Sequence, residues 1–376
     1  MTRHMFAGGY TPLGFVDFFD YIMPLETAQK RYFLKGASGS GKSTFIKKIA
    51  KKFEAASVGI DIFHCANDAT SLDGIAVKDF GFAIMDATAP HSHDPVIPAA
   101  IDEIIDFANF LDAEKVRKHA DEIKNLLDSK KNMYEKARKF LQAAGNICTA
   151  NREAHEATLI RPQIQDLARM CLSGFVNKSM NIATRRAIHQ PALPELTNAV
   201  AREATDRKLF LCAITPAGIV SFAKNTLGNY KVYGICTETG ADALLTEIKN
   251  LANSCGISTE SFFSPLEPNK RECVILPAEK LAFASTKGIF AYTGKVVEEV
   301  AEQFPTIPKK LLTSKADTLR NNKIIKNLLD AAIASMKNAV AVHSKIENMY
   351  IDKMDFAKVD DLTEKILQDC TLAFGV

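Results

Sequence analysis

The sequence predicts an α/β protein that contains one unit twice, each copy a parallel sheet with helices followed by a long helical hairpin. Three observations predict this fold class. Related segments recur at a nearly constant spacing, apolar segments typical of strands alternate with an amphipathic helical segment, and a long charged segment without proline follows them in each copy. Strands separated by helices pair in parallel through right-handed crossovers.

Composition and charge narrow the class of protein. The 376 residues are 47% hydrophobic and 24% charged, which excludes a disordered, collagen-like or disulfide-stapled chain. The net charge of +3 indicates neither a nucleic-acid nor a membrane partner. No apolar run approaches the roughly 20 residues of a membrane span, and the first residues lack the apolar core of a signal peptide. We therefore expect a cytoplasmic protein.

The eight cysteines are scattered singly, with no C-x-x-C pair to hold zinc or a redox disulfide. We interpret them as small buried hydrophobic residues. Cys65 beside His64 is the nearest candidate for a nucleophilic cysteine, although neighbouring residues on a strand point to opposite faces.

Internal repetition sets the domain organisation. Phe6, which is followed by the letters TPLG, reappears as Phe210 followed by TPAG. Gly41 and Gly240 lie 199 positions apart. Further aligned pairs are 32–36 with 230–234, 124–128 with 326–330, and Cys171 with Cys370. The match predicts an ancient duplication.

The repeat predicts one domain at 1–175, a connector at 176–207 and a second domain at 208–376. We interpret the connector as a solvated linker, and the alternative is an arm that reaches a phosphate. The residues that suggest the alternative are Arg185, Arg186, His189 and Arg202.

The elements of the first copy follow from hydrophobic periodicity. Alternation or apolar runs predict strands, the spacing of Phe45, Ile46, Ile49 and Phe53 predicts a helix, and the pattern turns helical from Pro98 onward. The predicted strands are 31–35, 58–65 and 81–86, the helix is 43–56, and the long helical region is 113–150, with its counterpart at 309–355. We expect the long helices to pack beside each sheet as hairpins with solvated charged faces.

A phosphate-binding motif follows the first of these strands and opens the helix. It satisfies G-x-x-x-x-G-K-[ST], in which backbone N–H groups and the helix N-terminus face anionic oxygens. Lys42 is expected to bridge the β- and γ-phosphates, and Ser43 to place its hydroxyl on Mg²⁺. The predicted nucleotide-binding residues are Gly36, Ala37, Ser38, Gly39, Ser40, Gly41, Lys42, Ser43 and Thr44.

A second element agrees with this motif. The apolar run 82–85 closes on Asp86, which is typical of a Walker B strand whose carboxylate holds Mg²⁺. Ala87 follows where fast ATPases place a glutamate that orients water. This favours slow hydrolysis, switching or phosphoryl transfer to another molecule.

Polar residues follow the second and third strands, at the edge where α/β sheets bind ligands. Asp68 or Asp73 is expected to accept a substrate proton or tune a water, and His91 to face the γ-phosphate. The alternative for both aspartates is turn chemistry. For His91 and His93 a zinc site is a further alternative, although no ligand cluster accompanies them.

The second copy lacks these groups at the 199-residue spacing. Alanine replaces the lysine, aspartate the P-loop serine, serine the Walker B aspartate, and phenylalanine both histidines. The replacements are Ala241 for Lys42, Asp242 for Ser43, Ser285 for Asp86, Phe263 for His64 and Phe290 for His91. We therefore expect a pseudo-site with a structural role.

The whole chain resembles a family of bacterial tandem P-loop ATPase-like proteins without an assigned physiological role. Four motifs carry the resemblance: F-x-x-x-x-T-P-x-G at the start of both copies, GASGSGKST at 36–44, H-C-x-x-D-x-x-S-L-D-G at 64–74, and DATAPH at 86–91. The resemblance implies a duplicated P-loop fold and nucleotide binding, and it implies no substrate.

Three functions remain open on the sequence. The first is Mg·ATP binding with slow hydrolysis coupled to a conformational change. The second is a kinase that transfers the γ-phosphoryl group to a small molecule or nucleotide, and the third is a non-catalytic, nucleotide-sensing scaffold with a small-molecule or protein partner. No N-K-x-D motif occurs in the first copy, which favours ATP over GTP. Candidates for an arginine finger are Arg152, Arg161 and Arg185.

Overall fold

The computed structural model describes residues 2–156, 159–175, 204–237, 240–300 and 315–375. The chain is an α/β protein, and its described residues form two mixed sheets of six strands each and eight α-helices. It divides into two compact units. Unit 1 comprises Met1–Ala143, Cys212–Phe222 and Lys326–Val376, and unit 2 comprises Ala144–Leu211 and Ala223–Ile325.

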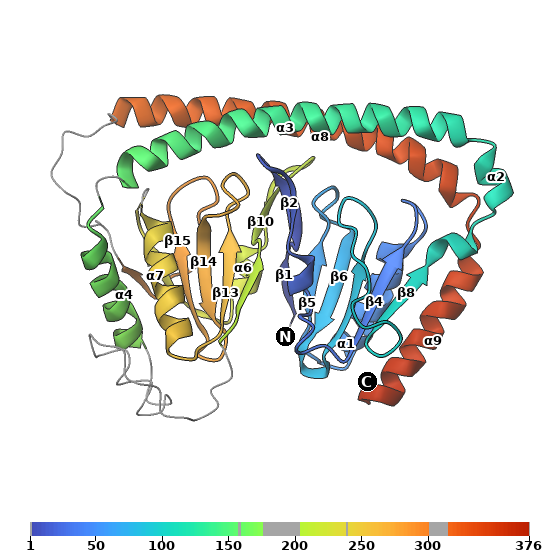
Figure 1. Cartoon of the computed structure of the whole chain (residues 1–376), viewed down its shortest axis with the longest axis horizontal. Helices are drawn as coiled ribbons and strands as arrows, with labels where there is room; N and C mark the ends of the chain where they lie inside the picture. Colours follow the sequence, from blue (N-terminus) through green and yellow to red (C-terminus); the bar gives the residue numbers. More distant parts are fainter. Residues whose placement is uncertain (1, 157–158, 176–203, 238–239, 301–314, 376) are drawn as a thin grey trace. The chain divides into compact units, whose positions relative to one another are not determined.

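The sheet of unit 1 has the strand order β1-β5-β6-β7-β4-β8 (Figure 1). Five strands are parallel to one another, and β6 is antiparallel to both of its neighbours. A separate hairpin, β2–β3, follows β1. The bounds are β1 Arg3–Met5, β2 Gly8–Thr11, β3 Gly14–Asp17, β4 Lys30–Lys35, β5 Asp61–His64, β6 Leu72–Val77, β7 Phe82–Asp86 and β8 Asp102–Asp106.

Two sequence predictions for this region are wrong. The segment after the second predicted strand is not a loop throughout, because Leu72 begins β6 and Asp73 lies within that strand. The sheet is therefore mixed and not purely parallel. The segment beyond Pro98 does not turn directly helical, because β8 first adds an edge strand beside β4.

A buried ion pair explains how the acidic strand β8 joins the sheet. Arg31 on β4 donates two hydrogen bonds to the Asp102 carboxylate, at 2.7 and 2.9 Å. The backbone N–H groups of Val96 and Ile97 donate to the same carboxylate, at 2.7 and 2.9 Å. Arg31 is 5% exposed and Asp102 is 1% exposed. The pair fixes β8 and the segment before it against the strand that leads to the predicted phosphate loop.

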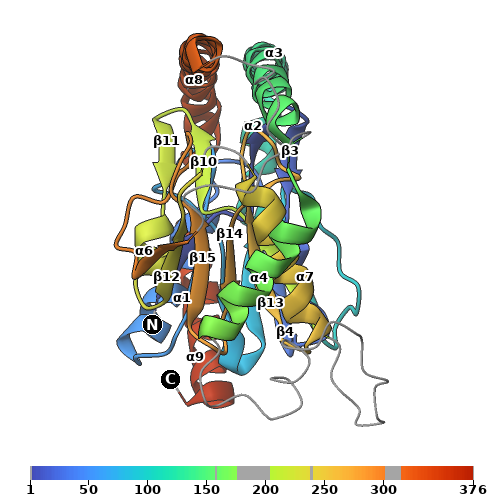
Figure 2. The same ribbon diagram turned by 90° about the vertical axis from the view of Figure 1, so that its left-hand side faces the viewer.

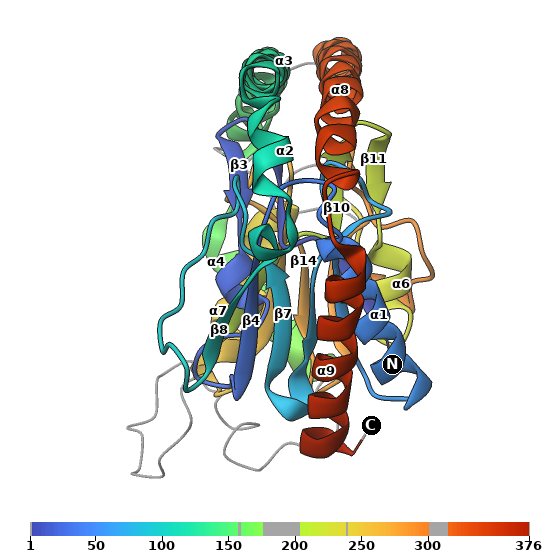
Figure 3. The same cartoon turned by 90° about the vertical axis from the view of Figure 1, so that its right-hand side faces the viewer.

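Helix α1, Lys42–Ala55, covers the sheet of unit 1 with its apolar face, as the spacing of its phenylalanines and isoleucines predicts. Helix α9, Phe356–Phe374, packs against α1 and places Val359, Ile366 and Cys370 in the same core (Figure 3). Unit 1 also contains the short helix α2, Ala113–Arg117.

Unit 2 repeats this architecture, with the strand order β16-β12-β15-β14-β13-β9 and one antiparallel strand, β14. Helix α7 covers the sheet, and α4 packs against α7 (Figure 2). The strands are β9 Asp206–Leu209, β12 Lys231–Ile235, β13 Thr259–Phe263, β14 Arg271–Leu276, β15 Leu281–Ser285 and β16 Glu298–Val300, and the helices are α4 Arg161–Phe175, α6 Ala223–Leu227 and α7 Ala241–Ser254.

The compact units are composed differently from the repeats of the sequence. Helix α4 ends the first copy but packs in the core of unit 2, whereas α9 ends the second copy and packs in the core of unit 1. The hairpin of β10, Cys212–Thr215, and β11, Gly218–Ser221, also belongs to unit 1. Each unit thus takes its last helix from the other copy. The connector lies outside the described residues over 176–203.

The two long helices pass from one unit into the other. Helix α3, Ala120–Glu156, gives its residues up to Ala143 to unit 1 and the remainder to unit 2. Helix α8, Lys315–Ile351, gives its residues up to Ile325 to unit 2 and the remainder to unit 1. None of the helices within the described residues is long and apolar enough to cross a membrane.

Strand registers correct the sequence alignment of the two loops. Leu34 pairs with Asp86 in unit 1, and Ile235 pairs with Ser285 in unit 2. Leu34 and Ile235 are therefore equivalent, whereas the sequence alignment placed Tyr32 opposite Tyr230. Because α1 and α7 begin 199 positions apart, the loop of unit 2 is two residues shorter than the loop of unit 1.

A pair of histidines is buried at the β1–β5 edge of unit 1. His64 Nδ1 lies 2.7 Å from the carbonyl oxygen of Ala69, so this nitrogen carries the proton and donates. His64 Nε2 then accepts from His4 Nδ1 at 2.8 Å, and the ring stacks on Phe222 with centroids 4.1 Å apart. Burial lowers the pKa of His64 to about 4, and burial also lowers the pKa of His4.

This pair predicts acid sensitivity. The unfolded chain protonates His64 near pH 6.5, whereas the folded chain keeps it neutral down to about pH 4. Folding stability should therefore fall as the pH drops from about 6.5 to about 4, by about 2 kcal/mol, and level off below. His64→Phe, which introduces the residue that the second copy has at Phe263, should flatten this part of the profile in urea unfolding. His119→Ala, a half-exposed histidine, should leave the profile unchanged.

Candidate functional site

The candidate site of unit 1 is built on the loop between β4 and α1. Gly36 and Gly39 have φ angles of +153° and +80°, which L side chains rarely adopt. A Cβ on Gly36 would lie 2.7 Å from the Cβ of Phe107, and one on Gly39 would lie 3.0 Å from the Glu347 carbonyl oxygen. The small residues of the motif are thus required by backbone shape and close packing. No side chain caps the first turn of α1, and no acidic residue lies there.

Lys42 folds back over this loop and is 8% exposed. Its Nζ donates to the carbonyl oxygens of Gly36 and Ala37, at 2.7 and 2.9 Å. The same atom lies 3.6 Å from Asp86 Oδ2. The lysine therefore holds a cation between the loop and the end of β7, as the motif predicts.

Ser43 and Asp86 tie the loop to its neighbours. Ser43 Oγ accepts the backbone N–H of Leu72 at 2.9 Å. Asp86 Oδ1 accepts the N–H of Thr88 at 2.9 Å, and the Thr88 hydroxyl donates to the Gly36 carbonyl at 3.2 Å. The Asp86 side chain is 17% exposed, so one carboxylate oxygen keeps access to solvent beside Lys42.

Asp73 and His91 meet beside this carboxylate. His91 Nδ1 donates to the Asp86 carbonyl at 3.0 Å, and its Nε2 lies 3.9 Å from Asp73 Oδ2. Phe19 stacks on the imidazole. Burial raises the pKa of Asp73 to about 6, with opposition from His91 and support from the Asp86 charge. The site thus combines a buried acid, an oriented imidazole and a carboxylate within reach of one lysine.

The structure does not bring every predicted residue into this group. Asp68 is exposed, and its oxygens accept hydrogen bonds from Thr70 and Ser71 within its own turn, as the alternative interpretation predicts. Thr44 is exposed on α1. Within the described ranges, no hydrogen bond or ion pair joins Asp68 to Lys42 or Asp86.

Two long helices supply residues that sequence reasoning missed. Ser38 Oγ donates to Glu347 Oε1 at 2.7 Å and lies 2.8 Å from His343 Nε2. His343 Nδ1 lies 2.7 Å from Lys130 Nζ, which must donate. His343 Nε2–H then donates to Ser38, and burial lowers the pKa of both Lys130 and His343. These helices carry many charged residues, so periodicity alone does not separate this buried group from solvated faces.

Ser40 adds an unsatisfied polar atom at the same loop. The residue is 1% exposed, and its hydroxyl has no hydrogen-bond partner among the residues that the structure describes. A buried hydroxyl without a partner costs free energy, which a bound ligand can recover.

Unit 2 keeps the framework of this site and changes its chemistry. Asp242 Oδ1 accepts the Arg271 N–H at 2.8 Å, which repeats the contact that Ser43 makes in unit 1. Ser285 Oγ donates to the Lys287 carbonyl at 2.9 Å. Of the arginine-finger candidates, Arg152 lies in unit 2 and pairs with Glu267 at 2.7 Å. Arg161 is exposed at the start of α4, and Arg185 lies outside the described residues.

Cysteine and metal chemistry were the alternatives for other residues. All eight cysteines are free of disulfides, and burial raises the pKa of the Cys65 thiol well above its usual value. His93 pairs with Asp17 at 3.2 Å. Across the described part of the chain, no group of three or more His, Cys, Asp or Glu side chains is placed to hold a metal ion.

Comparisons with known proteins give no relative. No protein-family model matches the chain, and no curated protein or solved structure is significantly similar to it.

Proposed function

We propose that unit 1 is a P-loop nucleotide site that binds Mg·ATP and hydrolyses it slowly, with the hydrolysis coupled to a conformational change. The observation that carries this proposal is the position of Lys42, whose ammonium is held over a glycine-rich loop at an uncapped helix start. Phosphate oxygens are the groups that such a loop and lysine bind. The unpartnered hydroxyl of Ser40 in the same loop supports an anionic ligand with acceptor oxygens.

The residues present also fit Mg²⁺. Ser43 and Asp86 offer a hydroxyl and a partly exposed carboxylate, which are the oxygen donors that this ion prefers. When bound, the ion would neutralise charge on the β- and γ-phosphates. Lys42 would leave its present carbonyl partners for the same oxygens.

The remaining groups suggest how water and charge are managed. Asp73 is buried and has a pKa of about 6, so it can accept a proton near neutral pH, and His91 orients its Nε2 toward that carboxyl. Lys130, which reaches the loop through His343 and Ser38, is the cation best placed to act as a charge-stabilising finger.

One observation favours a kinase as the second candidate. Ala87, 1% exposed, follows Asp86, so no carboxylate stands there to orient an attacking water. A nucleotide-sensing scaffold without turnover is the third candidate, and the proposed partner in either case is a small molecule or protein.

Incubation of the full chain with Mg·ATP separates these functions. Phosphate release without any acceptor, at a low rate, is the result expected for the proposed ATPase. Formation of ADP only when an acceptor is added would contradict it in favour of the kinase. Nucleotide binding without either product would leave the scaffold, and the absence of nucleotide binding would overturn the proposed site.

A further inference from the structure

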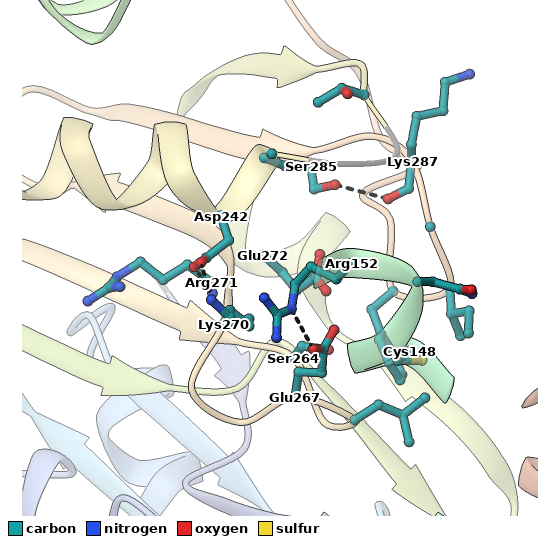
Figure 4. Close-up of a pocket in the computed structure, with 18 of the residues that line it drawn as sticks. Cys148, Arg152, Asp242, Ser264, Glu267, Lys270, Arg271, Glu272, Ser285 and Lys287 are labelled. Atoms are coloured by element: carbon teal, nitrogen blue, oxygen red, sulfur yellow. Dashed lines mark hydrogen bonds and ion pairs between the residues drawn. The ribbon is translucent and has the colours of Figure 1, made fainter. Parts of the chain in front are cut away.

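A cavity of about 490 Å³ opens in unit 2 at the position equivalent to the candidate site of unit 1. Its wall includes the start of α7, the end of β15 and the last turns of the unit 2 part of α3 (Figure 4). A cavity of this size accommodates a small organic molecule. The pseudo-site therefore has room for a ligand, although it lacks the groups that bind nucleotide phosphates.

The charges of the cavity explain which ligand it rejects. Asp242 lies in the first turn of α7, where a phosphate would approach the helix N-terminus. Its carboxylate already binds the Arg271 N–H and lies 3.2 Å from Lys270 Nζ. A bound anion would face this carboxylate directly, so anionic ligands are disfavoured.

The basic side chains nearest these acids are already engaged. Arg152 pairs with Glu267 at 2.7 Å and also with Glu156. Lys270 pairs with Asp242 and lies 3.7 Å from Glu156. In Figure 4 the side chain of Lys287 points away from this group. The cations of the cavity thus neutralise three of its acids and leave a fourth.

That fourth acid is Glu272, the equivalent of Asp73 in unit 1. Among the described residues it has no ion-pair partner, and its carboxyl hydrogen-bonds with Ser264. Burial raises the pKa of Glu272 to about 7, and the charges of Asp242 and Glu267 add to the rise. An acid in this environment is stabilised when a cation arrives beside it.

Unit 1 shows which cations unit 2 has lost. Beside Asp73, unit 1 has the Lys42 ammonium and the His91 imidazole, and both oppose the rise of the Asp73 pKa. In unit 2 the corresponding residues are Ala241 and Phe290, which line the cavity. The acid has been retained while both cationic neighbours have been replaced by smaller or apolar side chains. Space and uncompensated negative charge therefore coincide.

We propose that this cavity binds a small organic cation, a primary amine with an apolar body, whose ammonium takes the place of the Lys42 ammonium and pairs with Glu272. Ser264 and Ser285 offer further polar contacts, and the apolar wall suits the body of the ligand. The apolar wall residues are Leu266, Ile289, Phe290 and Ile325. This site is independent of nucleotide binding by unit 1.

Titration calorimetry on the full chain tests the proposal with four primary amines: 2-phenylethylamine, histamine, n-butylamine and 1,4-diaminobutane. Uncharged 2-phenylethanol and anionic phenylacetate are the matched controls for the first. At least one amine should bind with a stoichiometry of one, and neither control should bind. Absence of binding by all four amines at 10 mM, or equal binding of 2-phenylethanol, would overturn the proposal, whatever the chain does with ATP.

Three variants locate the site. Glu272→Gln keeps the shape of the side chain and should weaken amine binding at least about tenfold. Glu247→Gln removes a carboxylate from the same helix α7 outside the cavity and should have no effect. Ala241→Lys supplies an internal ammonium and should abolish amine binding without creating a nucleotide site. Unchanged amine affinity in Glu272→Gln contradicts the assignment even if Ala241→Lys does not fold.

The pH dependence gives an independent readout. Amine affinity should fall about tenfold per pH unit below pH 7, because the Glu272 carboxyl must be ionised to pair with the ligand. This slope should disappear in Glu272→Gln. A slope that persists in this variant would assign the titration to another group that faces the cavity. Those groups are Cys148, Arg152 and Glu156 of α3, Asp242 of α7, and Glu267, Lys270 and Arg271 between β13 and β14.

Discussion

Lys42→Ala should reduce the affinity of the chain for Mg·ATP by about 100-fold or more, because the ammonium is the cation closest to the loop that is proposed to hold the phosphates. Titration calorimetry should detect no binding at concentrations that saturate the native chain. The result is independent of whether the bound nucleotide is hydrolysed, transferred or only sensed.

The matched control is Lys48→Ala on the same helix. Lys48 is exposed and pairs only with Asp360 across the surface, at 2.5 Å. Its removal should leave nucleotide affinity within about twofold of the native value. Equal affinity of Lys42→Ala and the native chain would contradict the proposed site. Thermal unfolding of each variant shows whether a loss of binding reflects a loss of fold.

Asp102→Ala should lower the free energy of unfolding by about 3–5 kcal/mol, since it leaves the buried Arg31 guanidinium without its carboxylate. The N–H groups of Val96 and Ile97 lose their acceptor at the same time. Urea unfolding measures the loss. We expect it to be the largest effect on stability of the substitutions considered.

Glu103→Ala, one residue away on β8, is the control for this substitution. Glu103 pairs with Lys30 at 2.6 Å, but its side chain is 50% exposed. Its loss should cost less than about 1 kcal/mol. Similar effects of the two substitutions would show that burial of the Arg31 pair does not determine the stability of this edge.

The Asp102 pair also predicts a pH effect. Burial acts to raise the pKa of Asp102, but hydrogen bonds from Arg31, Ile97 and Val96 outweigh it and hold the pKa below its usual value. The stability that the pair contributes is present above the unfolded pKa and is lost as the pH falls through the lower folded value.

Local sequence pattern was sufficient for the parts of the fold that local pattern determines. The strand before the loop, helix α1 and the strand that ends at Asp86 lie within one or two residues of their predicted bounds. The same holds for the placement of Lys42 beside Asp86. In each case a glycine-rich turn or a run of apolar residues marks the element within a few positions of itself.

The missed elements depend on partners far away in the chain. β8 contains three acidic residues and reads as a solvated segment until Arg31, 71 positions earlier, neutralises Asp102. β6 begins with Leu72, Asp73 and Gly74, and the Asp-Gly pair is typical of a turn. The exchange of α4 and α9 between units leaves no local signal, because both helices have an apolar face that fits either equivalent core.

The candidate site shows the same division. The loop residues are predictable from their spacing, whereas Lys130, His343 and Glu347 reach the loop from helices distant in sequence. Glu272 is identified only when the pairing of every neighbouring charge in the cavity is known.

Titration of the full chain with a non-hydrolysable ATP analogue and Mg²⁺ tests the central claim, that the two copies have diverged into one nucleotide site and one site of different chemistry. The account predicts one equivalent of nucleotide per chain, none for Lys42→Ala, and still one for Ala241→Lys. Two equivalents on the native chain, or one that survives Lys42→Ala, would contradict it.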